Sequence, residues 1–144
     1  MSTPSRETLE TARRLHSAVI HLLRALRRQD AASGVGPARL SALSVLVFGG
    51  PTTLGALAQA EQVRPPTMTR LVNALEADGL VVRERDPADG RVTYLRASTK
   101  GQALLKAGRS RRVAALARQL GGLGGKDRDL LARAATLLER LASD

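Results

Sequence analysis

The stretch that decides the fold is "PPTMTRLVNALEADGLVVRERDPADGRVTYLR", residues 65–96. Its first half predicts a helix that opens at Pro65, because proline suits the first helical position. Apolar residues follow at steps of three and four, which indicates an inward face made of Met68, Leu71, Val72 and Leu75. Gly79 is placed to end this helix. In the second half, "LVVRER" and "VTYLRA" flank the turn-forming "DPADG", which predicts a β-hairpin.

A second short helix is expected just before this stretch. In "TTLGALAQA", residues 52–60, Thr53 is a natural N-cap and Leu54, Leu57 and Ala58 share one face. Two short helices joined by a tight turn, with a hairpin directly after the second, form a winged helix-turn-helix. The first helix braces the second, the second fits the DNA major groove, and the hairpin reaches the flanking backbone or the minor groove.

The outward face of the second helix carries groups that suit DNA. Once the apolar residues point inward, short hydroxyls, an arginine and an amide remain outside near the helix start: Pro66, Thr67, Thr69, Arg70 and Asn73. Such groups can meet base edges and phosphates, and a helix N-terminus favours phosphate. A plain surface helix is the alternative, but it explains neither the brace helix nor the hairpin.

The remaining chain is predicted to be helical. Apolar stripes indicate helices from Glu7 to about residue 32, over residues 37–48, over 99–120 after Ser98 as N-cap, and over 126–142 after the "GGLGG" break. The predicted fold is therefore mainly α with a small β-hairpin wing (α+β), a winged helix-turn-helix with a helical dimerisation lobe. Residues 37–97 would form the DNA-binding lobe, and residues 1–36 and 98–144 the dimerisation lobe.

The terminal helices are rich in leucine, which predicts a partner for them. A homodimer with two-fold symmetry would cover them and would place its two recognition helices roughly 34 Å apart, about one DNA turn. The alternative is that these helices pack on the central lobe of the same chain.

Composition points to a polyanionic partner. Lys plus Arg number 23 and Asp plus Glu 13, giving a formal net charge of +10. This balance predicts attraction to nucleic acid or to acidic membrane surfaces, although arginine enrichment also accompanies a high-GC coding background. With one Phe, one Tyr and no Trp, single-strand binding through base stacking is disfavoured. No apolar run approaches the roughly 18 residues of a membrane span, and the first residues lack a signal-peptide core, so we expect a soluble cytoplasmic protein without a membrane partner.

No catalytic or metal site is predicted. The chain has no cysteine, which excludes disulfides, thiolate metal sites and thiol redox sensing. His16 and His21 lie five residues apart and do not share the helix face that a metal needs. The "GGLGG" run lacks the ending of a phosphate-binding loop. We therefore expect neither an enzyme nor a cofactor. The basic segment at residues 108–118 is predicted to be a solvated face of the dimerisation lobe, with membrane or further DNA contact as alternatives.

Residues 53–101 resemble the DNA-binding lobe of the MarR (multiple antibiotic resistance regulator) family. The matching pieces are "TLGALAQA", "PPTMTRLVNALEADGLVVRERDPADGR" and "ASTKG". They have the family's Leu-Glu-x-x-Gly-Leu helix exit, its Asp-Pro-x-Asp-x-Arg wing and its Thr/Ser-x-x-Gly helix opening, in that order. The flanking helices suit the family too, so the resemblance covers essentially the whole chain. It implies a homodimeric regulator, usually a repressor, on a pseudo-palindromic operator of double-stranded DNA.

The resemblance also suggests roles for single residues. The candidate DNA-contacting positions are Thr53, Arg64, Pro66, Thr67, Thr69, Arg70, Asn73, Arg85, Asp89 and Arg91. In the wing, the resemblance implies that Arg91 enters the minor groove and that Asp89 holds the turn. Two positions depart from the family: Arg64 stands where a serine-like N-cap is usual, and Gly90 replaces a commonly basic wing residue, which removes a phosphate contact and predicts a looser tip.

A small-molecule effector is also implied by the resemblance, because the first helix of this family borders a ligand cleft. His16 is therefore a candidate effector-binding residue, with packing beside the apolar stripe as its alternative role. Any such pocket is expected to be aliphatic, with Arg or His as polar anchors. The predicted function is a sequence-specific, ligand-responsive transcriptional repressor. Two alternatives remain: a sequence-neutral architectural DNA-binding protein, and a winged-helix module that binds other proteins.

Overall fold

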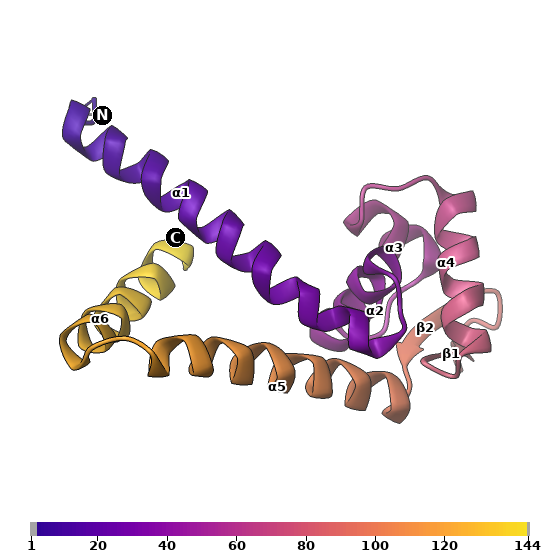
Figure 1. Cartoon of the computed structure of the whole chain (residues 1–144). Coiled ribbons are helices and arrows are strands. Elements are labelled where there is room, and N and C mark those ends of the chain that lie inside the picture. Colours follow the sequence, from indigo (N-terminus) through magenta and orange to yellow (C-terminus); the bar gives the residue numbers. More distant parts are fainter. Residues whose placement is uncertain (1–2, 144) are drawn as a thin grey trace.

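The computed structural model describes residues 3–143 and consists of one compact lobe with helices leading away from it (Figure 1). The lobe contains α2 (Pro37–Gly49), α3 (Leu54–Ala60), α4 (Pro65–Ala77) and the strands β1 (Val81–Arg85) and β2 (Thr93–Ala97). The helix α1 (Arg6–Arg27) continues into the 3₁₀ helix η1 (Arg28–Ser33) and enters the lobe. The helix α5 (Thr99–Gly121) leaves the lobe, and α6 (Gly125–Ala142) lies at its far end. The mainly α fold with a two-stranded wing is therefore confirmed.

Local signals set the helix ends where the sequence predicts them. The hydroxyl of Thr53 accepts a hydrogen bond from the amide of Ala56, and the hydroxyl of Ser98 accepts one from the amide of Gly101. The helix α4 begins at Pro65, and Gly79 follows its end with a φ of 71°. This left-handed conformation costs glycine little, because glycine has no Cβ. Arg64 occupies the N-cap position of α4 without a side-chain cap, in line with its departure from a serine-like residue.

The first helix differs from the prediction. It does not run as one α-helix to residue 32, because the α-helix ends at Arg27 and the chain tightens into η1. The Ser33 hydroxyl donates to the Asp30 carbonyl at 2.7 Å and accepts from the Val35 amide at 3.1 Å, so it takes the place of continued helical bonding. Gly34, with a φ of 70°, then ends the segment.

The main core cluster lies in the central lobe and joins its helices and strands, while Ala115 of α5 is buried outside it. Its largest fully buried side chains come from α2, α3, α4 and the hairpin: Leu43, Leu57, Met68, Val72, Leu75, Leu80, Val81 and Leu95. Of the predicted inward face of α4, only Leu71 remains partly exposed. The hairpin is antiparallel, with Val81 opposite Ala97 and Arg85 opposite Thr93. Thr52 pairs with Leu95 through two backbone hydrogen bonds of 3.1 and 2.7 Å, which ties the segment before α3 to the wing.

The terminal helices leave their apolar residues uncovered. Neither α1 nor α6 contains a buried residue. Many large apolar side chains on α1, α5, α6 and the turn before α6 are at least a third exposed: Leu9, Leu15, Val19, Leu22, Leu23, Val113, Leu123, Leu130, Leu131, Leu137, Leu138 and Leu141. In the single chain the start of α5 packs on the central lobe, whereas α1 and α6 do not bury their apolar residues there. Within residues 3–143, no single helix is both long and apolar enough to cross a membrane.

Candidate nucleic-acid interface

The outward face of α4 carries the predicted polar groups. The outward face of α4 exposes Pro66, Thr67, Arg70 and Asn73, while Thr69 is half-buried. The Thr69 hydroxyl donates to the Pro65 carbonyl at 3.0 Å, so only its acceptor capacity remains for a partner. Arg64 is exposed at the N-cap, and because Pro65 and Pro66 have no backbone N–H, the Thr67 amide is the first that the helix start can offer. The attraction of this end of α4 for phosphate therefore comes mainly from the exposed Arg64 cation and the helix dipole.

The brace helix α3 fixes the position of α4 through a tight turn. Its Leu57 and Ala58 are buried in the core, and Thr53 caps its first turn. Gln62 in the turn has a φ of 55°, the only positive φ at a residue other than glycine in the described chain. The Val63 amide donates to the Ala58 carbonyl at 3.0 Å and closes the turn. The left-handed residue therefore serves to reverse the chain between the two helices.

Hydrogen bonds within the turn hold the tip of the wing. The Asp86 carboxylate accepts from the amides of Ala88 at 2.7 Å and Asp89 at 3.3 Å. The backbone adds bonds between Asp86 and Val92 at 2.9 Å and between Val92 and Asp89 at 3.0 Å. This pattern is an Asx-type turn, in which an aspartate side chain satisfies amides two and three residues onward.

Arg91 projects from this turn into solvent. Its side chain is 92% exposed, yet its backbone amide and Nε both donate to Asp89 Oδ1, at 3.0 and 3.2 Å. The side-chain hydrogen bond from Arg91, followed by the backbone one, lowers the pKa of the Asp89 carboxyl. Asp89 therefore contacts both the backbone amide and the guanidinium of Arg91, while contact of either residue with DNA stays a prediction. Arg85, at the end of β1, is likewise exposed.

A second ion pair joins the two strands of the wing. Arg96 donates to Glu84 Oε1 through Nε at 3.0 Å and Nη2 at 2.6 Å. This hydrogen bonding and the charge of Arg96 lower the pKa of Glu84. Two acids of the wing, Glu84 and Asp89, are thus engaged by arginines, and a third, Asp86, caps the turn.

The sequence did not predict a contact between the wing and α4. Arg83 of β1 donates through Nε to Glu76 Oε2 at 3.0 Å and through Nη2 to Asn73 Oδ1 at 2.9 Å. Asn73 and Glu76 are three residues apart on α4 and so share a face. The three-residue spacing of Asn73 and Glu76, followed by an arginine on β1, was the sequence feature that could have predicted this contact.

The C-terminal end of α4 is anchored to α2 and α5. The Asp78 carboxylate pairs with Arg39 of α2 at 3.0 Å, and the Asp78 carbonyl accepts from Lys100 Nζ of α5 at 2.7 Å. The Ser98 hydroxyl donates to the Gly79 carbonyl at 2.6 Å. Cations and donors thus satisfy the free carbonyls at the end of the helix.

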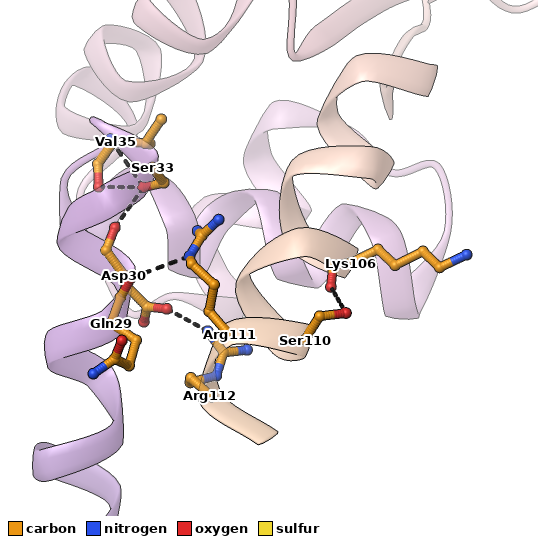
Figure 2. A network of polar contacts seen from close by, with 8 residues as sticks. All are labelled: Gln29, Asp30, Ser33, Val35, Lys106, Ser110, Arg111 and Arg112. Carbon is orange, nitrogen blue, oxygen red and sulfur yellow. Dashed lines mark hydrogen bonds and ion pairs between the residues drawn. The ribbon is translucent and has the colours of Figure 1, made fainter. Parts of the chain in front are cut away.

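The junction between η1 and α5 contains half-buried arginines (Figure 2). Arg112 forms an ion pair with Asp30, and Arg111 Nε donates to the Gln29 carbonyl at 3.4 Å. Beside them lies a cavity of about 670 Å³ between α1, η1, α2 and α5. Its lining combines the charged residues Arg27, Asp30, Arg111 and Arg112 with apolar ones such as Leu23, Leu40, Leu104 and Leu105.

The two histidines take no part in this cavity. His16 and His21 are exposed on α1, and neither lines it. Across residues 3–143, no three His, Cys, Asp or Glu side chains gather where they could hold a metal ion. The role of His16 with an effector stays a prediction.

Comparisons with known proteins agree with this geometry. Residues 33–92 match a family model described as the MarR family. The chain is 42% identical over 130 residues to the HTH-type transcriptional regulator Mb0904 of Mycobacterium bovis, a match that covers 90% of this chain and 91% of that one. A putative transcriptional regulator from Pseudomonas aeruginosa has a similar structure, with a TM-score of 0.80, 34% identity and coverage of 98% and 99%. A mutant of MepR from S. aureus, solved bound to an oligodeoxyribonucleotide, shares the fold with a TM-score of 0.71, 19% identity and coverage of 92% and 96%.

Proposed function

The chain belongs to the MarR family of transcriptional regulators, and from this premise we propose that it represses transcription by binding a pseudo-palindromic operator as a ligand-responsive homodimer. The observation that carries the proposal is the polar face of α4 next to the wing. Arg70 and Asn73 are exposed on the outward face of α4, whose opposite face packs in the core, and Arg91 extends from the wing tip. A helix in the major groove with an arginine beside it supplies both base contacts and backbone contacts.

Dimer formation is supported by the uncovered leucines. Leu130 and Leu137 on α6 are 57% and 56% exposed, and α1 exposes a further apolar stripe. A contiguous apolar surface of this kind on a chain with its own core indicates a protein–protein contact. With two-fold symmetry, each protomer would present one recognition helix to one operator half-site.

Sedimentation of purified protein tests the dimer directly. A Leu137→Glu variant should shift the protein toward a monomer, because a charge buried in the interface is costly. Thr136→Glu is the matched control, since the helical period places it on the face of α6 opposite the leucines. A Leu137→Glu protein that sediments like the wild type would exclude α6 from the interface.

A response to a ligand is supported by the cavity at the junction of the two lobes. The cavity lies between α1, α5 and α2. The helices α1 and α5 extend away from the central lobe, and α2 belongs to it. A molecule that bound there more tightly in one arrangement of the lobes would change the distance between recognition helices and so the affinity for DNA. The aliphatic lining and the arginines fit the expected pocket chemistry. His16 is retained as a candidate effector residue only in the dimer, where a partner could alter its surroundings.

Selection of bound sequences from random duplex DNA tests the proposal. A two-fold symmetric motif is the expected result. Even recovery of all sequences would favour the architectural DNA-binding protein instead. If the wild-type protein bound no duplex above background, and replacement of Arg70 and Arg91 by Ala changed nothing, the protein-interaction module would replace the proposal.

A further inference from the structure

Arg83 connects the wing to the base-reading face of α4. Its guanidinium lies between two side chains of the helix, 2.9 Å from Asn73 Oδ1 and 3.0 Å from Glu76 Oε2. The side chains of Arg83 and Glu76 are 36% and 42% exposed, so the contact lies at the surface beside the outward face of α4. No other wing residue in the described chain hydrogen-bonds to an α4 side chain.

The contact with Arg83 determines which way the Asn73 amide faces. A guanidinium has only donors, so the amide atom that meets it must be the oxygen. The Nδ2 group of Asn73 then points away from Arg83. It makes no hydrogen bond within residues 3–143, and Asn73 is exposed. The free hydrogen-bonding capacity of Asn73 is therefore mainly that of a donor.

A fixed donor selects among bases. An asparagine that reads adenine in the major groove uses both ends of its amide, with the oxygen accepting from N6 and the nitrogen donating to N7. In this protein an adenine amino group that approached Oδ1 would meet the N–H groups and the positive charge of Arg83. Guanine presents only acceptors, N7 and O6, on the same edge and avoids this conflict.

We propose that Arg83 is a positioning residue for base recognition: it holds the Asn73 amide with its N–H groups outward, so that Asn73 favours guanine over adenine at one base pair of each half-site. The inference rests on the proposed function, because it requires α4 to enter the major groove. The inference adds to the proposed function the preferred base, guanine, and a residue, Arg83, that affects this preference without contacting the base.

Selection from random duplex DNA with four proteins tests this role. The wild type should enrich guanine at one symmetric position per half-site, and Asn73→Ala should lose that preference. Arg83→Ala frees the amide to rotate, so adenine should gain on guanine there by about fivefold or more, the size expected for one bidentate contact. The double variant should match Asn73→Ala, because without Asn73 the amide that Arg83 positions is gone.

Two further variants separate positioning from a general effect on the wing. Asn73→Asp keeps an acceptor for Arg83 but removes the donor, so it should fold normally and lose the guanine preference. Arg96→Ala breaks the neighbouring wing ion pair with Glu84, which does not touch α4, and should leave every base preference unchanged. Thermal unfolding of each variant establishes that the proteins compared are folded.

The outcomes divide cleanly. A wild-type motif whose base preferences survive Arg83→Ala, with affinity lowered evenly, would identify Arg83 as a phosphate contact and overturn the inference alone. A guanine preference retained by Asn73→Asp would overturn it as well. Failure of the wild type to enrich any motif would overturn the proposed function and this inference together.

Discussion

Gly101, in the first turn of α5, packs directly against the carbonyl oxygen of Leu80, just beyond the end of α4. A Cβ at Gly101 would overlap this oxygen and would also lie 3.1 Å from Leu43 Cδ1 of α2. The same carbonyl accepts a hydrogen bond from the Ser98 amide at 2.9 Å. The segment after α4, the core helix α2 and the start of α5 therefore pack against one another here, with no room for a larger residue at position 101.

Gly101→Ala should destabilise the protein. The added methyl group requires either α5 or the segment after α4 to move, and such overpacking costs about 1–3 kcal/mol. Urea unfolding monitored by circular dichroism measures the change. The matched control is Gly121→Ala at the other end of α5, where a Cβ meets nothing within 4 Å. This control should be neutral or slightly stabilising, by about 0.4–1 kcal/mol. Equal stability of the two variants would contradict the close packing.

The Asp30–Arg112 ion pair should contribute to the stability of the junction. The two side chains are only 22% and 32% exposed, so solvent screens them less than it screens a fully exposed pair. We expect Asp30→Ala and Arg112→Ala each to cost about 1 kcal/mol, with a coupling energy of at least 0.5 kcal/mol in a double-mutant cycle. Arg109→Ala, an exposed arginine on the same helix, is the control and should stay within about 0.5 kcal/mol of the wild type. Additive single effects would show that the pair is not coupled.

What the sequence predicts well is local. The cap at Thr53, the helix start at Pro65 and the turn at Gly79 depend on neighbouring residues, so their positions follow from residue types and spacing. The face of α4 follows from helical periodicity in the same way. Contacts between distant segments do not follow: Arg112 meets Asp30 across 82 residues, and no pattern within either segment indicates the other. The Arg83 contact was missed for a related reason, because it depends on the angle at which the wing leaves α4.

Acid should loosen the wing before it unfolds the lobe. Arginine partners lower the pKa of Glu84 and Asp89 below their ordinary values of 4.5 and 3.8. For a group with a lowered pKa in the folded state, the stabilisation is present above the ordinary pKa and is lost as the pH falls through the folded one. Hydrogen exchange at the Arg91 amide, corrected for its intrinsic rate, should therefore accelerate at low pH.

Two controls isolate the carboxylate of Asp89 in this experiment. The Ala56 amide bonds to the Thr53 hydroxyl, which does not titrate in this range, so its protection should not follow the titration of Asp89. In Asp89→Asn, the pH dependence at Arg91 should disappear. A wild-type Arg91 amide that exchanges at the same corrected rate above and below the titration range would rule out a stabilising role for Asp89.

Arg91→Ala should weaken DNA binding and its dependence on salt. The exposed guanidinium is held by a hydrogen bond from its Nε to Asp89, so part of its conformational freedom is already lost before it meets a phosphate or the minor groove. Loss of one phosphate contact should lower the slope of log K against log salt concentration by about 1, and the affinity by roughly 5-fold or more. Fluorescence anisotropy with a selected duplex at several salt concentrations measures both.

Arg118→Ala and Arg91→Lys make this experiment specific. Arg118 is exposed in the last turn of α5, so its removal changes the net charge by the same amount without touching the wing. It should leave the salt slope unchanged. Arg91→Lys keeps the charge and should restore the slope, but not the full affinity if a narrow minor groove favours arginine. Equal losses in Arg91→Ala and Arg118→Ala would show that the wing contributes only general attraction, in which case Arg91 would make no specific contact.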